Sequence, residues 1–151
     1  MKLLVVGLGS MGKRRVRNLQ AIGGHELAGF DPREDRRTEA RSKYGIDVYD
    51  DFEEAVRQHA PQVLVISTPP DLHMTYAYRA LEGRMHVFIE ASVVEADRIL
   101  ELGERSRSAG LVMLPSCTMH FYPGPAMVRE ALREGLVGSP LMFTYPSGQY
   151  L

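Results

Sequence analysis

The sequence has little of several features that would tie it to a particular environment. Its 151 residues include one cysteine, Cys117, so no disulfide can form within the chain, and this usage is typical of a reducing compartment. A net charge of −1 gives no reason to expect nucleic acid or an anionic membrane as a partner. The first apolar run ends at Gly7, too early for a signal-peptide core or a bilayer span. We expect a cytoplasmic protein that binds neither nucleic acid nor membranes.

Lysines and clustered metal ligands are also scarce. The three lysines are Lys2, Lys13 and Lys43, so the chain beyond residue 43 contains none. Cys117 and His120 are isolated from other ligand types, and their spacing predicts no metal site. The length fits one domain, or one domain with part of a second.

A strand, a glycine-rich turn and a helix stand in order at the N-terminus. Leu3–Val6 is an apolar run typical of a buried strand, and apolar residues at helical spacing cover residues 11–22. Between them lies Gly7-Leu-Gly9-Ser10-Met11-Gly12, a G-x-G-x-x-G motif. The first glycine allows a tight turn, the second lets phosphates approach, and the third brings the helix close to the sheet. This order predicts a dinucleotide site at the helix N-terminus; the alternative is an ordinary glycine-rich turn.

Asp31 ends the second predicted strand, Leu27–Phe30, about 20 residues after the glycine motif. A carboxylate at this position accepts hydrogen bonds from ribose hydroxyls and repels a 2′-phosphate, so it favours NAD over NADP. The alternative is a local turn, since Asp31-Pro32 is favourable turn chemistry. Three arginines follow, at Arg33, Arg36 and Arg37. They favour a phosphate contact, and so NADP, or form a solvated helix face.

Strand and helix patterns alternate along the rest of the chain. Further strands are predicted at Ile46–Tyr49, Val63–Ile66, His86–Ile89 and Leu111–Leu114, separated by helices over 33–43, 51–59, 71–81 and 92–109. Helix caps are predicted at Asp51 with Glu54, at Asp71, and at Ser92 with Glu95. This alternation predicts an α/β protein with a doubly wound parallel sheet of the Rossmann type. Its ligands then lie beyond the carboxyl ends of the strands, at Gly7–Gly12, Asp31, Ser67–Pro70 and Glu90–Ser92.

Several motifs resemble one known family. They are Val5-Val-Gly-Leu-Gly-Ser-Met-Gly12, Ile66-Ser-Thr-Pro-Pro-Asp-Leu-His73, Ala80-Leu-Glu-Gly-Arg-Met-His-Val-Phe-Ile-Glu90 and Phe121-Tyr-Pro123. The chain resembles the N-terminal half of the glucose–fructose oxidoreductase / inositol dehydrogenase (Gfo/Idh/MocA) family. The resemblance implies an NAD- or NADP-dependent oxidoreductase acting on a sugar-like or cyclitol-like substrate. It also implies a second α/β domain that supplies substrate contacts and an oligomer interface.

The resemblance sets expectations for the domains and for the cofactor loop. Residues 1–120 are expected to form the Rossmann domain, and 121–151, with a helix at 126–134 and a strand at Leu141–Tyr145, to begin the incomplete second domain. Ser67, Thr68, Pro69 and His73 resemble the family's loop beside the nicotinamide ribose. His73 has two open roles, a cofactor contact or a local polar contact. We expect a homo-oligomer.

Two departures from the family weaken the expectation of catalysis. The family usually has Glu-Lys-Pro after the fifth strand, whereas this chain has Glu90-Ala91-Ser92. The family's second-domain catalytic histidine would lie beyond Leu151. Glu90 either contacts the nicotinamide end or accepts local helix N–H groups. His120 is the weak candidate for general acid/base catalysis, because imidazole titrates near neutral pH.

The basic residues after the glycine motif also have two open roles. One of them reaches the pyrophosphate, or all lie on an exposed helix surface; they are Lys13, Arg14, Arg15 and Arg17. Two functions follow from these observations. The first is the cofactor portion of an NAD-dependent oxidoreductase, with the 151-residue chain alone inactive. The second is a non-catalytic NAD-binding module, favoured by Ala91.

Overall fold

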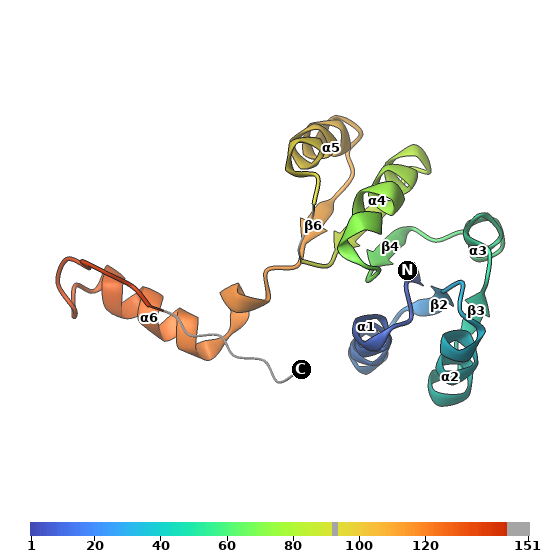
Figure 1. Cartoon of the computed structure of the whole chain (residues 1–151), viewed down its shortest axis with the longest axis horizontal. Coiled ribbons are helices and arrows are strands. Elements are labelled where there is room, and N and C mark those ends of the chain that lie inside the picture. The colour runs from blue at the N-terminus through green and yellow to red at the C-terminus, as the bar shows by residue number, and fades with distance from the viewer. Residues whose placement is uncertain (92–93, 145–151) are drawn as a thin grey trace. The chain divides into compact units, whose positions relative to one another are not determined.

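The computed structural model of this chain describes residues 1–91 and 94–144. The chain divides into two compact units, Met1–Ser116 and Cys117–Leu151. The described part of the first unit contains six strands in one sheet (Figure 1). The strands are β1 (Lys2–Val6), β2 (Glu26–Phe30), β3 (Asp47–Tyr49), β4 (Val63–Ile66), β5 (His86–Ile89) and β6 (Met113–Pro115).

Helices connect consecutive strands of this sheet. They are α1 (Ser10–Ile22), α2 (Glu34–Tyr44), α3 (Phe52–His59), α4 (His73–Glu82) and α5 (Ala96–Ser108), with a short 3₁₀ helix, η1 (Pro70–Leu72), before α4. Figure 1 shows α1 and α2 together on one side and α4 and α5 on the other. Parallel strands need such crossovers, because each strand must return to the same end of the sheet.

All neighbouring strands run parallel, in the order β3-β2-β1-β4-β5-β6. Val6 at the end of β1 pairs with Phe30 on one side and with Ile66 on the other. Strands β2 and β3 therefore follow β1 on one side of it, and β4, β5 and β6 follow one another on its other side. The predicted doubly wound Rossmann fold is confirmed, and its strand order reverses between β1 and β4.

Each face of the sheet has its own core. Leu4 and Val6 point to one face, where Met74 of α4 and Leu102 of α5 are buried in the same cluster. Leu3 and Val5 point to the other face, which α1 and α2 cover through residues that include Val16 and Ala40. The alternation follows from the two-residue period of a strand, so an all-apolar run is buried on both sides. These two layers hold the carboxyl ends of β1, β2, β4 and β5 at one edge.

Local signals predicted some boundaries well and others poorly. The cap at Asp51 is confirmed, because its carboxylate accepts the Glu54 N–H at 2.7 Å. The predicted cap at Asp71 is wrong: this residue lies inside η1, and α4 begins at His73 without a side-chain cap. The cap predicted at Ser92 with Glu95 lies partly outside the described residues. β6 lies slightly later than predicted and ends at Pro115, which an edge strand tolerates.

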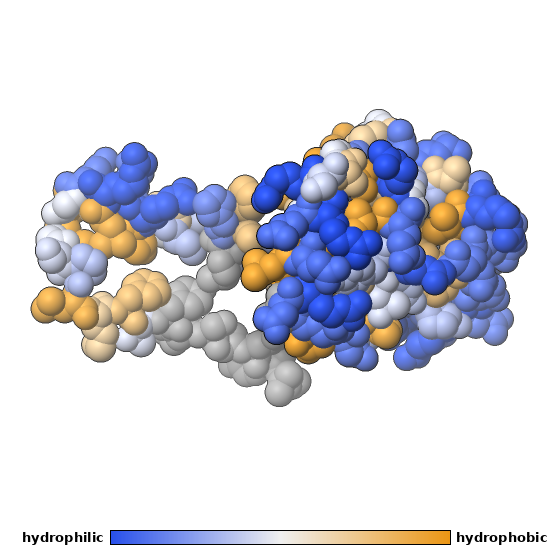
Figure 2. Space-filling model, turned by 90° about the horizontal axis from the view of Figure 1, so that it is seen from above, coloured by the Kyte–Doolittle hydropathy of each residue, from blue (hydrophilic) through white to orange (hydrophobic). Residues whose placement is uncertain are grey.

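The second unit consists of η2 (Thr118–Phe121), α6 (Pro123–Arg133) and the segment that follows. Residues 141–144 of the predicted strand Leu141–Tyr145 have no regular structure, and Tyr145 lies outside the described residues. Large apolar side chains of this unit are exposed, and Figure 2 shows them as orange patches; they include Phe121, Met127, Leu136, Leu141 and Phe143. Its role as the start of a substrate and oligomerisation domain remains a prediction.

No helix among residues 1–91 and 94–144 is long and apolar enough to cross a membrane.

Candidate functional site

The glycine motif forms a tight turn between β1 and α1. Gly7 has φ of +92°, and a β-carbon there would stand 2.8 Å from the carbonyl oxygen of Ser67. A β-carbon on Gly12 would stand 1.8 Å from the carbonyl oxygen of Gly7. Neither position has room for a side chain, because backbone atoms fill the space. The tight turn predicted at Gly7 and the close helix packing predicted at Gly12 are therefore confirmed, and both exclude a side chain.

The N-terminus of α1 is open to an anion. Gly9 is its N-cap residue, no side chain accepts a capping hydrogen bond, and the first turn contains no acidic residue. The first N–H groups of a helix lack partners within the helix, and they carry partial positive charge. Ser10 and Met11 begin the helix at this point. The turn can therefore receive phosphate oxygens through backbone N–H groups.

Asp31 is buried at the end of β2, with 1% of its surface exposed. Its Oδ2 accepts the backbone N–H of Leu8 at 2.8 Å, which ties the carboxylate to the glycine turn. Its Oδ1 accepts the N–H of Arg33 at 2.9 Å. The alternative local turn is thus present, together with a hydrogen bond to the glycine turn.

The three arginines after Asp31 have different partners. Arg36 donates to Asp31 Oδ2 at 3.2 Å, and its guanidinium lies 3.6 Å from where a β-carbon on Gly9 would stand. Arg37 donates to the carbonyl oxygens of Asp31 and Pro32 at 2.9 and 2.8 Å. Arg33 pairs with exposed Asp35. Only Arg36 is therefore held at the carboxylate and beside the glycine turn.

The loop after β4 contains polar atoms without partners. The Ser67 and Thr68 hydroxyl oxygens and His73 Nδ1 are buried with no hydrogen bond. His73 Nε2 lies 2.8 Å from the Thr68 carbonyl oxygen, and Nε2 must donate because a carbonyl only accepts. The local role of His73 is thus present, and Nδ1 is its remaining acceptor. Unpartnered buried hydroxyls are costly unless a ligand supplies the missing bonds. Pro69, exposed in this loop, precedes η1.

Glu90 follows β5 and is paired across the site with Arg15 of α1. Arg15 donates to Glu90 Oε2 from Nη2 at 2.6 Å and from Nε at 3.1 Å. Burial acts to raise the pKa of the Glu90 carboxyl, but the hydrogen bond and charge of Arg15 outweigh it, so this pKa lies below its usual range. The predicted local contact is weak, with Ala91 N–H at 3.4 Å from Oε1.

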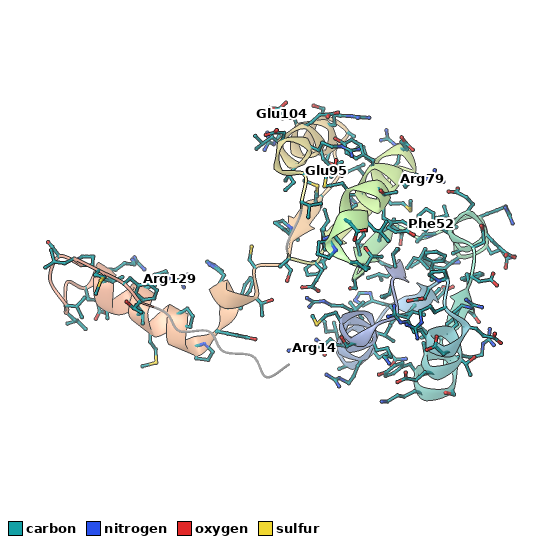
Figure 3. All side chains as sticks on the ribbon, viewed as in Figure 1. Arg14, Phe52, Arg79, Glu95, Glu104 and Arg129 are labelled. Atoms are coloured by element: carbon teal, nitrogen blue, oxygen red, sulfur yellow. The ribbon has the colours of Figure 1, made fainter. Side chains whose placement is uncertain are left out.

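The sequence analysis named Arg15 and Arg36 only within two clusters of basic residues and selected neither as a site residue. Arg15 lies three residues after Gly12 and contacts Phe88 and Glu90 at the edge of the sheet. Arg14 is exposed and points away from the sheet (Figure 3). That helical phase was the available signal for Arg15. The spacing of Arg36 from Asp31 was a weaker signal, because Arg33 and Arg37 lie on the same helix or at its start.

Most predicted site residues meet at one edge of the sheet. Hydrogen bonds join Gly7 to Phe30, Leu8 to Asp31, Ser67 to Val6 and Glu90 to Ile66. His120 is exposed in the second unit, where its Nδ1 lies 3.5 Å from Arg129 Nη1. Its catalytic role therefore stays a prediction.

The fold and this edge define a Rossmann-type dinucleotide-binding domain. Residues 1–114 match the oxidoreductase family with an NAD-binding Rossmann fold, Gfo/Idh/MocA, and the chain belongs to this family. The predicted family, fold and NAD cofactor are thereby confirmed. The glycine cradle, the buried carboxylate and the unpartnered hydroxyls of Ser67 and Thr68 fit such a cofactor.

Relatives and solved structures share this fold. The inositol 2-dehydrogenase of Rubrobacter xylanophilus is 27% identical over 143 residues, covering 92% of this chain and 41% of its own. The WlbA dehydrogenase of Bordetella pertussis, solved with NADH and UDP-GlcNAcA, has a TM-score of 0.81 at 19% identity, over 89% of this chain and 41% of its own. The scyllo-inositol dehydrogenase of Lactobacillus casei, solved with NAD(H) and scyllo-inositol, has a TM-score of 0.81 at 21% identity. The match covers 91% of this chain and 42% of that one. The chain spans about two fifths of the length of these proteins.

Replacing Gly12 with alanine tests the close contact between α1 and the glycine turn. The added β-carbon collides with the Gly7 carbonyl oxygen, so we expect the free energy of unfolding to fall by about 3 kcal/mol. Arg14→Ala on the exposed side of the same helix should change it by less than about 0.5 kcal/mol. Denaturant unfolding followed by circular dichroism measures both. Equal midpoints for the two variants would contradict the contact.

The lowered pKa of Glu90 predicts how the ion pair with Arg15 depends on pH. A carboxyl whose pKa is lower in the folded state stabilises the fold above its ordinary value, about 4.3, and this contribution disappears as pH falls through the folded value. We expect Glu90→Gln to be less stable than wild type at pH 6, and the difference to shrink below about pH 4. Glu104→Gln, at an exposed position, is the control. A difference that is independent of pH would rule out the ion pair as its source.

Proposed function

We propose that this chain is the cofactor-binding portion of an NAD-dependent oxidoreductase. The enzyme moves a hydride between nicotinamide and a sugar-like or cyclitol-like alcohol or carbonyl. The observation that carries the proposal is the buried Asp31 carboxylate, tied to the glycine turn through Leu8 N–H at 2.8 Å. Membership of an oxidoreductase family and the inositol 2-dehydrogenase relative support the reaction class.

Each half of the proposed site has a separate task. Backbone N–H groups at Gly9–Gly12 bind the pyrophosphate, and Asp31 accepts from the adenosine ribose hydroxyls. Ser67, Thr68 and Glu90 follow β4 and β5, where the nicotinamide half belongs, and His73 holds the Thr68 carbonyl. When bound, NAD supplies the carbon that accepts or donates the hydride.

Proton transfer needs a titratable group in addition to the cofactor. Oxidation of an alcohol releases a proton, and Ala91 has no group that can accept it. Glu90 is paired with Arg15, and its lowered pKa keeps it ionised. His120 is the remaining proposed acid/base group, since its side chain is exposed and histidine is the most common general acid and base in enzymes.

A non-catalytic NAD-binding module is the second candidate, and Ala91 is the observation that favours it. In that case the chain acts as a sensor or a partner subunit and turns over no substrate. For either function we propose a homo-oligomer in the cytoplasm, and for the enzyme a small sugar-like substrate. The exposed apolar residues of the second unit support association.

Replacing Asp31 with asparagine tests its ribose role and the choice between cofactors. The variant keeps the side-chain volume but loses the charge that repels a 2′-phosphate, and Arg36 is then free to pair with that phosphate. We expect the ratio of NADH to NADPH affinities to fall at least about tenfold, measured by calorimetry on the 151-residue chain. Asp47→Asn, exposed on β3, should leave the ratio unchanged. Equal losses of both affinities would indicate a purely structural role for Asp31.

Restoring a lysine at position 91 separates the two functions. Ala91→Lys should raise kcat by about a hundredfold, as a general acid/base group does, with little change in NAD affinity. Ala91→Met adds a chain of similar length without the amine and should not raise it. The measurement is NAD reduction by the native protein product, tested with a panel of sugars and cyclitols. No turnover by the wild type or the lysine variant would favour the binding module.

A further inference from the structure

We propose that Arg15 is a positioning residue that holds the Glu90 carboxylate at the nicotinamide end of the site and neutralises its charge. The pair then sets how strongly the site prefers oxidised over reduced cofactor. This inference rests on the proposed function, because it requires a dinucleotide that lies across the carboxyl ends of the strands.

Glu90 occupies the position in the second half of the sheet that corresponds to the position of Asp31 in the first half. The fold consists of two three-strand halves, β1-β2-β3 and β4-β5-β6, which meet between β1 and β4. Asp31 comes directly after β2, the second strand of the first half, and Glu90 directly after β5, the second strand of the other half. The two halves of a Rossmann fold bind the two nucleotides of the cofactor. If Asp31 meets the adenosine ribose, Glu90 lies at the nicotinamide nucleotide.

Three different elements fix the guanidinium of Arg15. It comes from α1, donates two hydrogen bonds to Glu90 Oε2 after β5, and lies 3.4 Å from Ser116 Oγ after β6. It also stacks over the Phe88 ring at 4.8 Å, a cation–π contact. The side chains of Arg15 and Glu90 are only 20% and 16% exposed. Both Arg15 donors use Oε2, whereas Oε1 has a long contact, 3.4 Å, with the Ala91 N–H.

The charges explain why the pair matters to the cofactor's redox state. The nicotinamide ring of NAD⁺ carries a positive charge, and that of NADH is neutral. A lone carboxylate beside the ring would favour NAD⁺, and a lone guanidinium would favour NADH, whereas the ion pair balances these effects. Residue 91 is alanine and adds no charge, so Arg15 is the cation that faces Glu90.

Two single variants and their combination test this inference in the 151-residue chain. Calorimetry at pH 7.5 would give the Kd of NAD⁺, NADH and ADP-ribose for wild type, Arg15→Gln, Glu90→Gln and the double variant. We expect the first variant to shift the NAD⁺/NADH affinity ratio about tenfold toward NAD⁺, and the second about tenfold toward NADH. The double variant should return close to the wild-type ratio. A merely structural role would weaken both cofactor forms alike in every variant.

Two controls separate failure of this inference from failure of the proposed function. Arg14→Gln changes the exposed neighbour of Arg15 and should leave the ratio unchanged. ADP-ribose lacks the nicotinamide, so its binding reports on the glycine turn and Asp31 alone. If ADP-ribose binds and the ratio is the same in all variants, the role of Arg15 is overturned and the dinucleotide site stands. If the wild type binds neither ADP-ribose nor NADH, both proposals are overturned.

Discussion

The close approach of α1 to the end of β1 is the constraint on which the rest of the site depends. Gly12 packs so near the Gly7 carbonyl that the structure has no room for a β-carbon. This contact fixes the start of α1 at the edge of the sheet, and the helix N-terminus then points into the space where the strands end. It also brings Leu8 N–H to Asp31 and lets Arg15, one turn along, reach Glu90. One backbone contact thus positions the anion site and brings a hydrogen-bond donor to each of the two carboxylates.

Both carboxylates at this edge are held by arginines. Asp31 is nearly inaccessible and Glu90 is mostly covered, and a carboxylate that loses water needs compensating donors or charge. Arg36 from α2 pairs with the first and Arg15 from α1 with the second. In each half of the sheet, the charge of a partly desolvated carboxylate is therefore compensated by an arginine from a helix of the first half. Each pair also leaves the carboxylate oriented before a ligand arrives, which lowers the ordering cost of binding.

The parts predicted from the sequence are those that depend on nearby residues. The apolar runs, the glycine turn and the cap at Asp51 follow from periodicity and local hydrogen bonding. Asp71 failed as a cap because Pro70 starts a 3₁₀ turn that carries the chain past it. The Arg15–Glu90 pair joins residues 75 positions apart, so helical phase could have selected Arg15 but no local pattern predicts its partner. A strand such as Leu141–Tyr145 needs a partner strand, so its apolar pattern alone is not sufficient.

Binding and chemistry depend on different parts of this molecule. The proposed pyrophosphate site uses backbone N–H groups, which depend on the glycines of the turn and not on a particular side chain. Proton transfer needs a titratable side chain at a defined point, and alanine at position 91 removes the group that relatives of this type usually have. Glu90 cannot replace it while Arg15 keeps it ionised, because a paired carboxylate with a lowered pKa is a poor base near neutral pH. If Glu90 and Arg15 lie at the nicotinamide, as we propose, their balanced charges are compatible with holding either redox form of the cofactor. Hydride transfer with an alcohol then needs a proton acceptor other than Glu90.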